Sequence, residues 1–403
     1  MVNKKKIVLI TLLTPTRENT RGASALPYHL AKNRPKEVDL KIFTFNGNGI
    51  VAGDFNDISK ELNATIEVVQ SDLRYKWLRA INRILPFMRG ILPYPIAYYV
   101  GLNKEIVKEI NEWSTEIWIY GEEFAHFAKL FPEKRCVITT PDCEAMYYQR
   151  VLSIPSKLNS FFKIIRYGRA YWQYLNLAKS FPCENSIYHL VGKEDTEFLK
   201  KINPNIKTVF IPHPHYEGNT NRQIKFSSPK IKLLLPGRYD FYCQEAVDEV
   251  IEALVNSEFL SPYYEITFQG KNWDKPAEKL AKAGFSVHVK GFVPDYKEEL
   301  CQHDIQLSPI SLGTGTKGKV LDAFVNGLLV IAPLRAIENI KVMNKIDYLF
   351  YNRADELINI LDSIPKDIEQ FELVAKNGRK TVIEVHNPSS IAYQVFKLFN
   401  FSN

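Results

Sequence analysis

A chain of 403 residues with 45% hydrophobic residues has ample material for a core, and its length predicts two domains or more, because single cores stop growing at roughly 250–300 residues. The formal net charge of +7 predicts attraction to something anionic: a nucleic acid, a phosphorylated ligand or a membrane surface. No apolar run approaches the roughly 20 residues that cross a bilayer, which excludes a membrane-spanning helix.

Near the N-terminus, three lysines precede an apolar run over residues 7–13, an order that superficially resembles a signal peptide. No small-residue cleavage site follows and Pro15 interrupts the segment, so we expect a buried first β-strand instead. Five cysteines are scattered along the chain without the spacing of a disulfide framework or a metal site, which predicts free thiols in a reducing compartment. We therefore expect a cytoplasmic protein.

The first half of the chain alternates strand-like apolar runs with helical stretches, which is the pattern of a parallel α/β sheet. The strand-like runs are residues 7–13, 38–45, 66–69, 117–120 and 136–140. A second series of such runs follows and predicts a second parallel sheet. Its strands are expected at residues 231–235, 265–269, 287–290, 305–307 and 328–332.

Prolines and polar residues mark a linker between the two series at residues 213–230. We therefore predict a first domain over residues 1–212 and a second domain over residues 231–383. The amphipathic segment 384–403 is expected to form a helix that packs back on the first domain.

The most informative segment lies late in the second series, where a short strand leads into a glycine-rich loop and then a helix. The loop contains Gly313, Gly315 and Gly318, and apolar residues at helical spacing follow it. Glycines let the backbone come close to a ligand, and the free amides and dipole of a helix start favour negative charge. Because Lys317 and Lys319 add positive charge, the segment predicts an anion-binding site.

The same segment admits two other interpretations. Its glycine spacing, with Glu338 about 20 residues later, matches a dinucleotide-binding fingerprint. Against this interpretation, the next predicted strand ends in Pro333 rather than at an acidic residue. The other alternative is a tight turn with two solvated lysines, because lone glycine patterns are weak signals.

Three signatures in the second half resemble those of a known family. They are residues 235–240, which include Gly237 and Arg238, residues 290–295, and the glycine loop with the strand after it, residues 313–332. Together with the two α/β halves, they resemble the family-four (group 1) retaining glycosyltransferases, which use nucleotide-sugar donors. The resemblance implies an α/β chain with the GT-B fold, in which two Rossmann-like domains with parallel sheets face a central cleft.

The resemblance implies that the second domain binds the donor and that Arg238 contacts its diphosphate, a role that suits a fixed cation with several donors. The lysine usual six positions later is replaced by Gln244, so Lys317 is expected to supply the missing charge. Thr314 and Asp322 occupy the places of the family's paired glutamates, the second of which usually holds the ribose. Alternatively, Asp322 is an acid at a helix N-terminus, stabilised by the dipole. The predicted donor-binding residues are Gly237, Arg238, Gly313, Thr314, Gly315, Thr316, Lys317, Lys319 and Asp322.

In the first domain, the resemblance implies an acceptor-binding side. The loop after the first strand lies where family members have a glycine-rich turn, and Gly22 and Ser24 fit a helix-starting loop there. Asp142 and Glu122 follow predicted strands, and an α/β sheet presents such strand ends to the cleft. The alternative is that each carboxylate is a helix cap. The predicted catalytic residues are Asp142, Glu122, Arg238 and Lys317, and no protein nucleophile is expected.

The implied activity is transfer of a sugar from a nucleotide sugar to a saccharide or lipid-linked saccharide, with retention of configuration. Arg238, Lys317, Lys319 and the loop amides would stabilise the departing diphosphate. No metal or cofactor is expected, and the chain lacks an Asp-x-Asp metal motif. Two alternatives stay open: a sugar-nucleotide epimerase or hydrolase of the same fold, and a non-catalytic GT-B scaffold, which the residues Gln244 and Thr314 suggest.

Two segments, residues 74–92 and 157–172, interleave basic and aromatic side chains. Apolar and cationic positions segregate there as on interfacial helices, which favours contact with an anionic membrane surface. The alternative is a pair of ordinary helices with an aromatic core face and a solvated basic face. Membrane contact would place the protein on the inner face of the cell membrane, with a lipid-linked acceptor in the synthesis of surface polysaccharide or lipopolysaccharide. No nucleic-acid partner is expected, because no recognised binding module is present.

Overall fold

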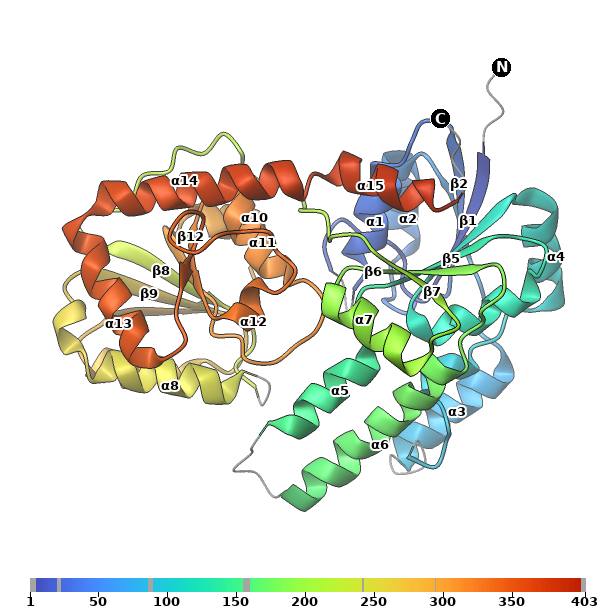
Figure 1. The fold of residues 1–403 in the computed structure, drawn as a ribbon, viewed down its shortest axis with the longest axis horizontal. Coiled ribbons are helices and arrows are strands. Elements are labelled where there is room, and N and C mark those ends of the chain that lie inside the picture. The colour runs from blue at the N-terminus through green and yellow to red at the C-terminus, as the bar shows by residue number, and fades with distance from the viewer. Residues whose placement is uncertain are drawn as a thin grey trace. The chain divides into compact units, whose positions relative to one another are not determined.

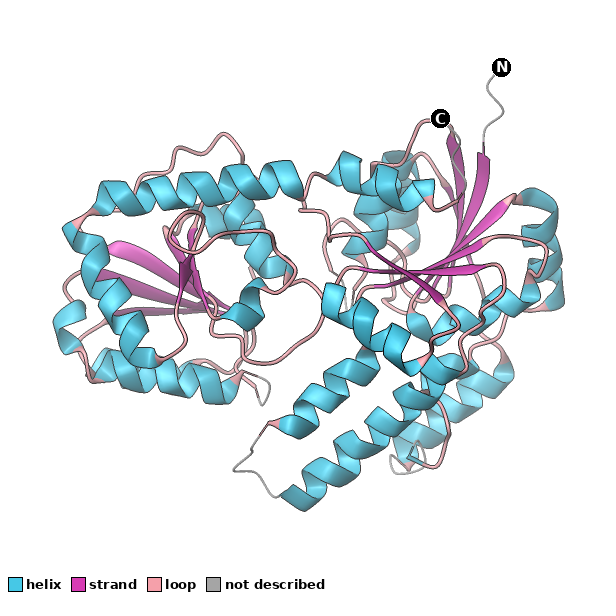
Figure 2. Cartoon of the chain, viewed as in Figure 1, coloured by secondary structure: helices cyan, strands magenta, loops and turns pink. Residues whose placement is uncertain are grey.

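The computed structural model describes residues 5–19, 23–85, 90–154, 160–240, 243–293 and 295–399 of the chain. The chain forms two compact units (Figure 1). The first unit contains Met1–Pro214 and Pro388–Asn403, and the second contains His215–Asn387. Each unit is built on a parallel sheet with flanking helices (Figure 2).

The sheet of the first unit has seven strands in the order β3-β2-β1-β4-β5-β6-β7. Their bounds are β1 Lys5–Thr11, β2 Val38–Thr44, β3 Thr65–Val68, β4 Glu116–Tyr120, β5 Cys136–Thr140, β6 Ser186–Leu190 and β7 Lys207–Phe210. Because β1 pairs in parallel with both β2 and β4, the strand order reverses between β1 and β4. Ligands of such sheets bind beyond the carboxyl ends of the strands at this reversal, which is called the switch point.

Strand β1 is buried on both faces of the sheet. Successive side chains of a strand point to opposite faces, so Val8 and Ile10 join one apolar layer while Ile7 and Leu9 join the other. Strands that are covered on both faces read as continuous apolar runs, which explains why β1 resembled a signal peptide in the sequence. The helices of this unit are α1 Ala25–Lys32, α2 Ala52–Leu62, α3 Leu73–Ile84, η2 Ile96–Tyr99, α4 Lys104–Trp113, η3 Glu122–Leu130, α5 Glu144–Ser153, α6 Ser160–Lys179, α7 Lys193–Ile202 and α15 Pro388–Lys397.

The C-terminal helix α15 packs against the first unit beside α1 (Figure 1). The ring of Phe396 on α15 meets Trp118 of β4 edge to face, with the ring centroids 5.5 Å apart. The segment 384–403, predicted as one helix, is divided: α14 (Ile368–Val385) ends before α15 starts at Pro388. Proline suits a first helical position because it has no amide hydrogen to donate, and it could not continue α14.

The sheet of the second unit has six strands in the order β10-β9-β8-β11-β12-β13, with its switch point between β8 and β11. The strands are β8 Ile231–Pro236, β9 Tyr264–Gln269, β10 Ser286–Lys290, β11 Ile305–Leu307, β12 Leu329–Ala332 and β13 Leu349–Phe350. The other helices of this unit are α8 Gln244–Val255, η4 Glu258–Leu260, α9 Asp274–Lys282, α10 Tyr296–Cys301, α11 Gly318–Val325, α12 Leu334–Ile337, α13 Ala354–Ser363 and η5 Ile364–Lys366.

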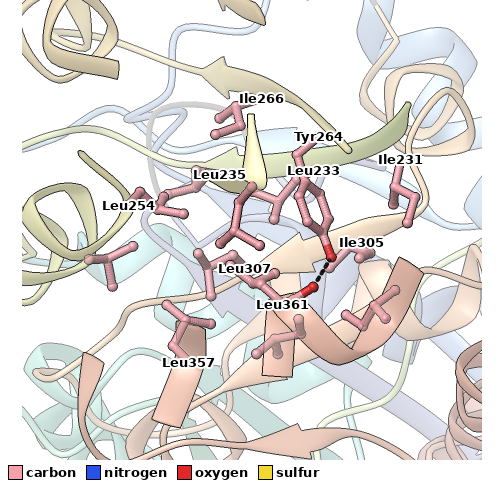
Figure 3. Close-up of a cluster of buried hydrophobic side chains, with 14 of the residues drawn as sticks. Ile231, Leu233, Leu235, Leu254, Tyr264, Ile266, Ile305, Leu307, Leu357 and Leu361 are labelled. Carbon is pink, nitrogen blue, oxygen red and sulfur yellow. Dashed lines mark hydrogen bonds between the residues drawn. The ribbon is translucent and has the colours of Figure 1, made fainter. Parts of the chain in front are cut away.

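Figure 3 shows part of the apolar core of the second unit, where side chains of the sheet meet those of α8 and α13. Tyr264 on β9 is buried in this core, and its hydroxyl donates a hydrogen bond of 2.7 Å to the carbonyl of Leu361. The bond satisfies a polar atom that would otherwise be costly to bury, and it ties α13 to the sheet.

The α/β architecture with two Rossmann-like units is the one that the sequence predicted. The second compact unit begins at His215, so residues 215–230, predicted as part of a linker, are grouped with that unit. Ile224 and Phe226 explain the grouping, because both are buried in its core. Among the described residues, no helix is long and apolar enough to cross a membrane.

Candidate functional site

The predicted donor residues gather at the switch point of the second sheet. Gly237 and Arg238 follow β8, and the glycine loop follows β11, the neighbouring strand on the other side of the reversal. The carboxyl ends of both strands lie on the same edge of the sheet because the strands are parallel. The fold therefore brings together two segments that are about 75 residues apart in sequence, where a ligand is expected to bind.

The turn after β8 depends on glycine. Gly237 has φ +134°, a conformation that other residues rarely adopt, and its carbonyl accepts a 2.9 Å hydrogen bond from the indole of Trp273. The backbone of Gly270 passes so close that a Cβ there would lie 1.7 Å from the carbonyl oxygen of Gly237. Arg238 follows with a side chain that is 65% exposed, its Nε 3.8 Å from a carboxylate oxygen of Asp240. The turn thus holds its backbone tightly and leaves the guanidinium open to a ligand.

The glycine loop is shaped by its own lysine. Gly313 and Gly315 have φ of +143° and +60°, and the ammonium of Lys317 donates to the carbonyls of Thr314, at 2.7 Å, and Gly315, at 3.3 Å. Asn339 donates a further 3.1 Å bond to the Gly315 carbonyl. Helix α11 starts directly after Lys317, so its first amides lie next to this charge. For Lys317, the alternative of a freely solvated lysine is wrong.

Helix α11 starts at Gly318, so Asp322 lies in its second turn, and the first turn contains no acidic residue. The dipole effect falls off within the first turn, so the alternative of an N-terminal acid does not explain this residue. Lys319, one turn earlier, has its ammonium 5.6 Å from the centroid of the Tyr296 ring. Burial raises the pKa of Tyr296 well above its ordinary value, and the carboxylate of Asp322 adds to that shift. Asp322, Lys319 and Tyr296 therefore form one polar group beside the loop.

Gln306 is a residue of this site that the sequence analysis missed. It lies on β11 with no exposed surface, and its amide donates to the hydroxyl of Ser308, at 2.9 Å, and to the carbonyl of Lys319, at 3.2 Å. It therefore ties the strand before the loop to the helix after it. The available signal was a glutamine between two apolar residues in a short buried strand.

Glu338 does not occupy the place that the dinucleotide interpretation requires. It follows α12 rather than β12, and its carboxylate pairs with Arg335 at 2.7 Å. A ribose-binding acid of that fingerprint is expected near the end of the next strand. The structure thus argues against the dinucleotide interpretation of the glycine loop.

A pocket of about 220 Å³ opens in the first unit at the carboxyl ends of β1, β4 and β5. It lies at the switch point of that sheet, and Glu122 and Asp142 both line it. The full lining is Thr11, Leu12, Leu13, Ala23, Tyr120, Gly121, Glu122, Glu123, Phe124, Pro141, Asp142 and Glu144. The predicted site residues did not include Tyr120, Glu123 or Glu144, although each lies within two residues of a predicted carboxylate.

Ser24, which was also predicted for this side, is not part of the pocket lining. Ser24 is fully buried before α1, with its hydroxyl 2.6 Å from that of Thr16 and within hydrogen-bond distance of the Glu18 carbonyl. These contacts give Ser24 a role in shaping the loop. Gly22 lies outside the described residues.

Three carboxyl groups of the pocket, those of Glu122, Glu123 and Glu144, have raised pKa values. Glu122 is 4% exposed, and burial raises its pKa well above the ordinary value, helped by the nearby Glu123 and Glu144. It accepts a 3.2 Å hydrogen bond from the amide of Glu144, the first residue of α5, so it also caps that helix. Burial raises the pKa of Glu123 too, while its bond from the Tyr174 hydroxyl, at 3.0 Å, opposes the shift. The pKa of Glu144 rises to about 8, chiefly through burial.

Replacing Glu144 with glutamine is expected to raise the melting temperature near pH 8 and to leave it unchanged near pH 5. Between the ordinary pKa of 4.5 and about 8, the folded state keeps a proton on Glu144 that the unfolded state has lost. Folding stability from this group therefore falls as pH rises, and the neutral glutamine removes that loss. Melting curves of both proteins across this range measure the effect.

Glu278→Gln is the control, because the pKa of Glu278 is lowered by its bond to Lys282 and the loss of charge there brings no gain at pH 8. A melting-temperature difference for Glu144→Gln that stays the same at both pH values would contradict the assignment.

Two parallel sheets, each with a central switch point and flanking helices, define the class of fold as GT-B. No family model matches the chain, and no curated protein matches it in sequence. Solved structures of this fold match it over nearly its whole length. HepE from Anabaena, solved in complex with UDP, has a TM-score of 0.64 and 13% sequence identity, covering 98% of this chain and 99% of its own.

Two further structures of the same fold are similar to an equal degree. Sucrose-phosphate synthase from Thermosynechococcus elongatus has a TM-score of 0.64 and 13% identity, with 98% of each chain covered. A glycosyltransferase from Rickettsia africae has a TM-score of 0.63 and 14% identity, covering 99% of this chain and 98% of its own. HepE was also solved in complex with UDP-glucose. At such low identity the likeness shows the fold.

Proposed function

We propose that this protein is a glycosyltransferase that moves a sugar from a nucleotide-sugar donor to a saccharide or lipid-linked saccharide acceptor. The observation that carries the proposal is the site at the second switch point, where an exposed arginine follows β8 and a lysine-stabilised glycine loop leads from the neighbouring strand β11 into α11. Such a set suits a diphosphate, because fixed cations and free helix amides both bind anionic oxygens. A similar structure, HepE, holds UDP and UDP-glucose, which supports the same ligand class here.

The proposed role of this site is to stabilise the leaving group. As the bond to the sugar breaks, negative charge grows on the departing nucleoside diphosphate. Arg238, Lys317, Lys319 and the amides at the start of α11 would balance that charge electrostatically. We propose that these groups act without a divalent metal and that Asp322 binds the ribose, as the resemblance to the retaining enzymes implies.

The resemblance of the same signatures to retaining enzymes also supports transfer with retention of configuration and without a protein nucleophile. In this scheme, Glu122 and Asp142 act on the acceptor side in the first unit. Glu122, whose pKa burial raises well above its ordinary value, would donate a hydrogen bond in its protonated form, while Asp142 would accept one from the attacking hydroxyl.

A thermal-shift screen against UDP, GDP, ADP, their glucose or mannose conjugates and NAD tests the donor assignment. We expect one nucleoside diphosphate series to raise the melting temperature, since a ligand at about 100 times its Kd stabilises a fold by about 2.7 kcal/mol. The shift should be lost in Asp322→Ala. Stabilisation by NAD alone would contradict the proposal.

We further propose that the first unit binds an anionic membrane through the segments 74–92 and 157–172, of which residues 86–89 and 157–159 lie outside the described residues. Helices α3 and α6 contain no acidic residue. On α3, Leu73, Trp77 and Ile84 are each more than two-thirds exposed beside its basic side chains. This surface would suit a lipid-linked acceptor used on the cytoplasmic face of the membrane in surface polysaccharide or lipopolysaccharide synthesis.

Sedimentation with phosphatidylglycerol vesicles tests the membrane proposal. We expect binding that Trp77→Ala weakens and that is absent with neutral phosphatidylcholine vesicles, because both apolar insertion and charge attraction contribute. Equal binding to both vesicle types, or none, would contradict it.

A further inference from the structure

The pocket of the first unit has an unusual electrostatic lining for a protein with a net charge of +7. Four of its lining residues are carboxylic acids: Glu122, Glu123, Asp142 and Glu144. The described residues that line it include no lysine, arginine or histidine. A phosphate or carboxylate group placed there would meet like charge, and none of the described lining residues would supply a compensating cation.

Tyr120 gives independent evidence that the pocket takes a ligand. It is the last residue of β4, it lines the pocket, and it is only 6% exposed. Its hydroxyl is buried without a hydrogen-bond partner in the described structure. The strand pairing fixes its backbone between Thr11 of β1 and Thr139 of β5, so Tyr120 cannot readily turn away to find one. Buried polar atoms are normally bonded, and an exception at a pocket wall points to a missing partner.

The turn after Tyr120 positions the carboxyl groups of Glu122 and Glu123 at the same pocket. Gly121 has φ +106°, which glycine adopts easily, and η3 begins directly after it with Glu122 and Glu123. Glu144 reaches the pocket from the start of α5, where its amide bonds to Glu122. Atoms that can donate or accept hydrogen bonds thus surround one small volume at the ends of two strands.

We propose that this pocket is an acceptor subsite for an uncharged sugar ring, whose hydroxyl groups bond to Tyr120 and to the surrounding carboxyl groups, and that it rejects sugars bearing a phosphate or carboxylate. The proposal rests on the proposed function and deepens it by naming the class of acceptor.

A sugar hydroxyl fits this lining because it both donates and accepts hydrogen bonds. An ionised carboxylate only accepts, whereas a protonated carboxyl group and the tyrosine hydroxyl can donate. Burial raises the pKa of Glu144 to about 8, so its protonated form is present near neutral pH, and burial also raises the pKa of Glu122 well above its ordinary value. The pocket volume of about 220 Å³ suits a single sugar ring better than a longer saccharide. An anionic sugar would instead be repelled by the ionised carboxylates nearby, which would weaken its binding.

Saturation-transfer NMR titrations of the full chain test the subsite without any nucleotide. The probes are the methyl glycosides of glucose, galactose and mannose, each compared with the 6-phosphate of the same sugar. We expect at least one neutral glycoside to bind, and its 6-phosphate to bind at least about 10-fold more weakly. Tyr120→Phe should weaken binding of the neutral glycoside by about 3- to 10-fold, as loss of one hydrogen bond predicts, without lowering the melting temperature.

Tyr188→Phe is the matched control. Tyr188 is a buried tyrosine of the same unit whose hydroxyl donates a 2.9 Å bond to the Pro182 carbonyl, so its removal should lower the melting temperature and leave sugar binding unchanged. Absence of binding by all neutral glycosides, equal or tighter binding of a 6-phosphate, or unchanged binding by Tyr120→Phe would overturn the proposal. If the neutral sugar binds but no nucleoside diphosphate does, the proposed function fails while the sugar site stands.

Discussion

Replacing Arg238 with alanine is expected to lower kcat/KM for the nucleotide sugar by about 10²- to 10³-fold, which is the usual loss when one preorganised donor to a developing negative charge is removed. The loss should fall mainly on kcat, because the charge on the diphosphate grows in the transition state. The melting temperature should hardly change, since the side chain is 65% exposed and its ion pair with Asp240, at 3.8 Å, is long. Steady-state kinetics with melting curves on the same preparations measure both effects.

Arg353→Ala is the matched control for Arg238. Arg353 belongs to the same unit, is also 65% exposed and pairs with Asp355 at 2.7 Å, but it lies before α13 and away from the predicted donor residues in sequence. It should leave kcat/KM unchanged. An equal fall in both variants would show that the effect of Arg238 is one of general surface charge.

Replacing Gly270 with alanine is expected to destabilise the second unit by about 3 kcal/mol or more and to abolish donor binding. The added Cβ would lie 1.7 Å from the carbonyl oxygen of Gly237, and Gly270 itself has φ +131°. Steric overlap with backbone cannot be relieved by rotating a side chain, so the turn that presents Arg238 must move. Denaturant unfolding measures the stability, and nucleotide titration measures the binding.

Gly291→Ala provides the comparison for Gly270. Gly270 follows β9 and Gly291 follows the adjacent strand β10, yet a Cβ at Gly291 would meet nothing within 4 Å. That variant should stay within about 0.5 kcal/mol of the parent, as surface changes usually do. If Gly270→Ala were equally mild, the close approach of the two turns would not be important for the site.

The sequence was sufficient to predict strands β1 to β5 and β8 to β12 and the glycine loop, because these are local patterns, whereas β6, β7 and β13 were not among the predicted strands. Apolar runs such as residues 7–13 and 305–307 became strands β1 and β11, and the glycine loop leads into α11 as predicted. The turn at Gly237 was also visible, since glycine followed a buried strand. Each of these features depends on neighbours a few residues away, which is the range that periodicity and turn chemistry describe.

The remaining parts of the site depend on contacts that are remote in sequence. Asn339 bonds to Gly315 across 24 residues, and Gly270 touches Gly237 only because β8 and β9 are neighbours in the sheet. Likewise, Glu144 meets Glu122 because β4 and β5 pair and place their carboxyl ends together. Sequence patterns identified Glu122 and Asp142 separately, but the acidic character of the pocket emerges only when three strand ends are assembled.

The central claim is that a nucleotide sugar is consumed to glycosylate an acceptor. Its most direct test is mass spectrometry of the donor and products after incubation with the nucleotide sugar that stabilises the protein, with and without a panel of saccharide acceptors. We predict that nucleoside diphosphate accumulates only when an acceptor is present, together with a product heavier by one sugar residue, and that Arg238→Ala suppresses both. Consumption or isomerisation of the nucleotide sugar at the same rate without any acceptor would contradict this account and indicate a hydrolase or an epimerase.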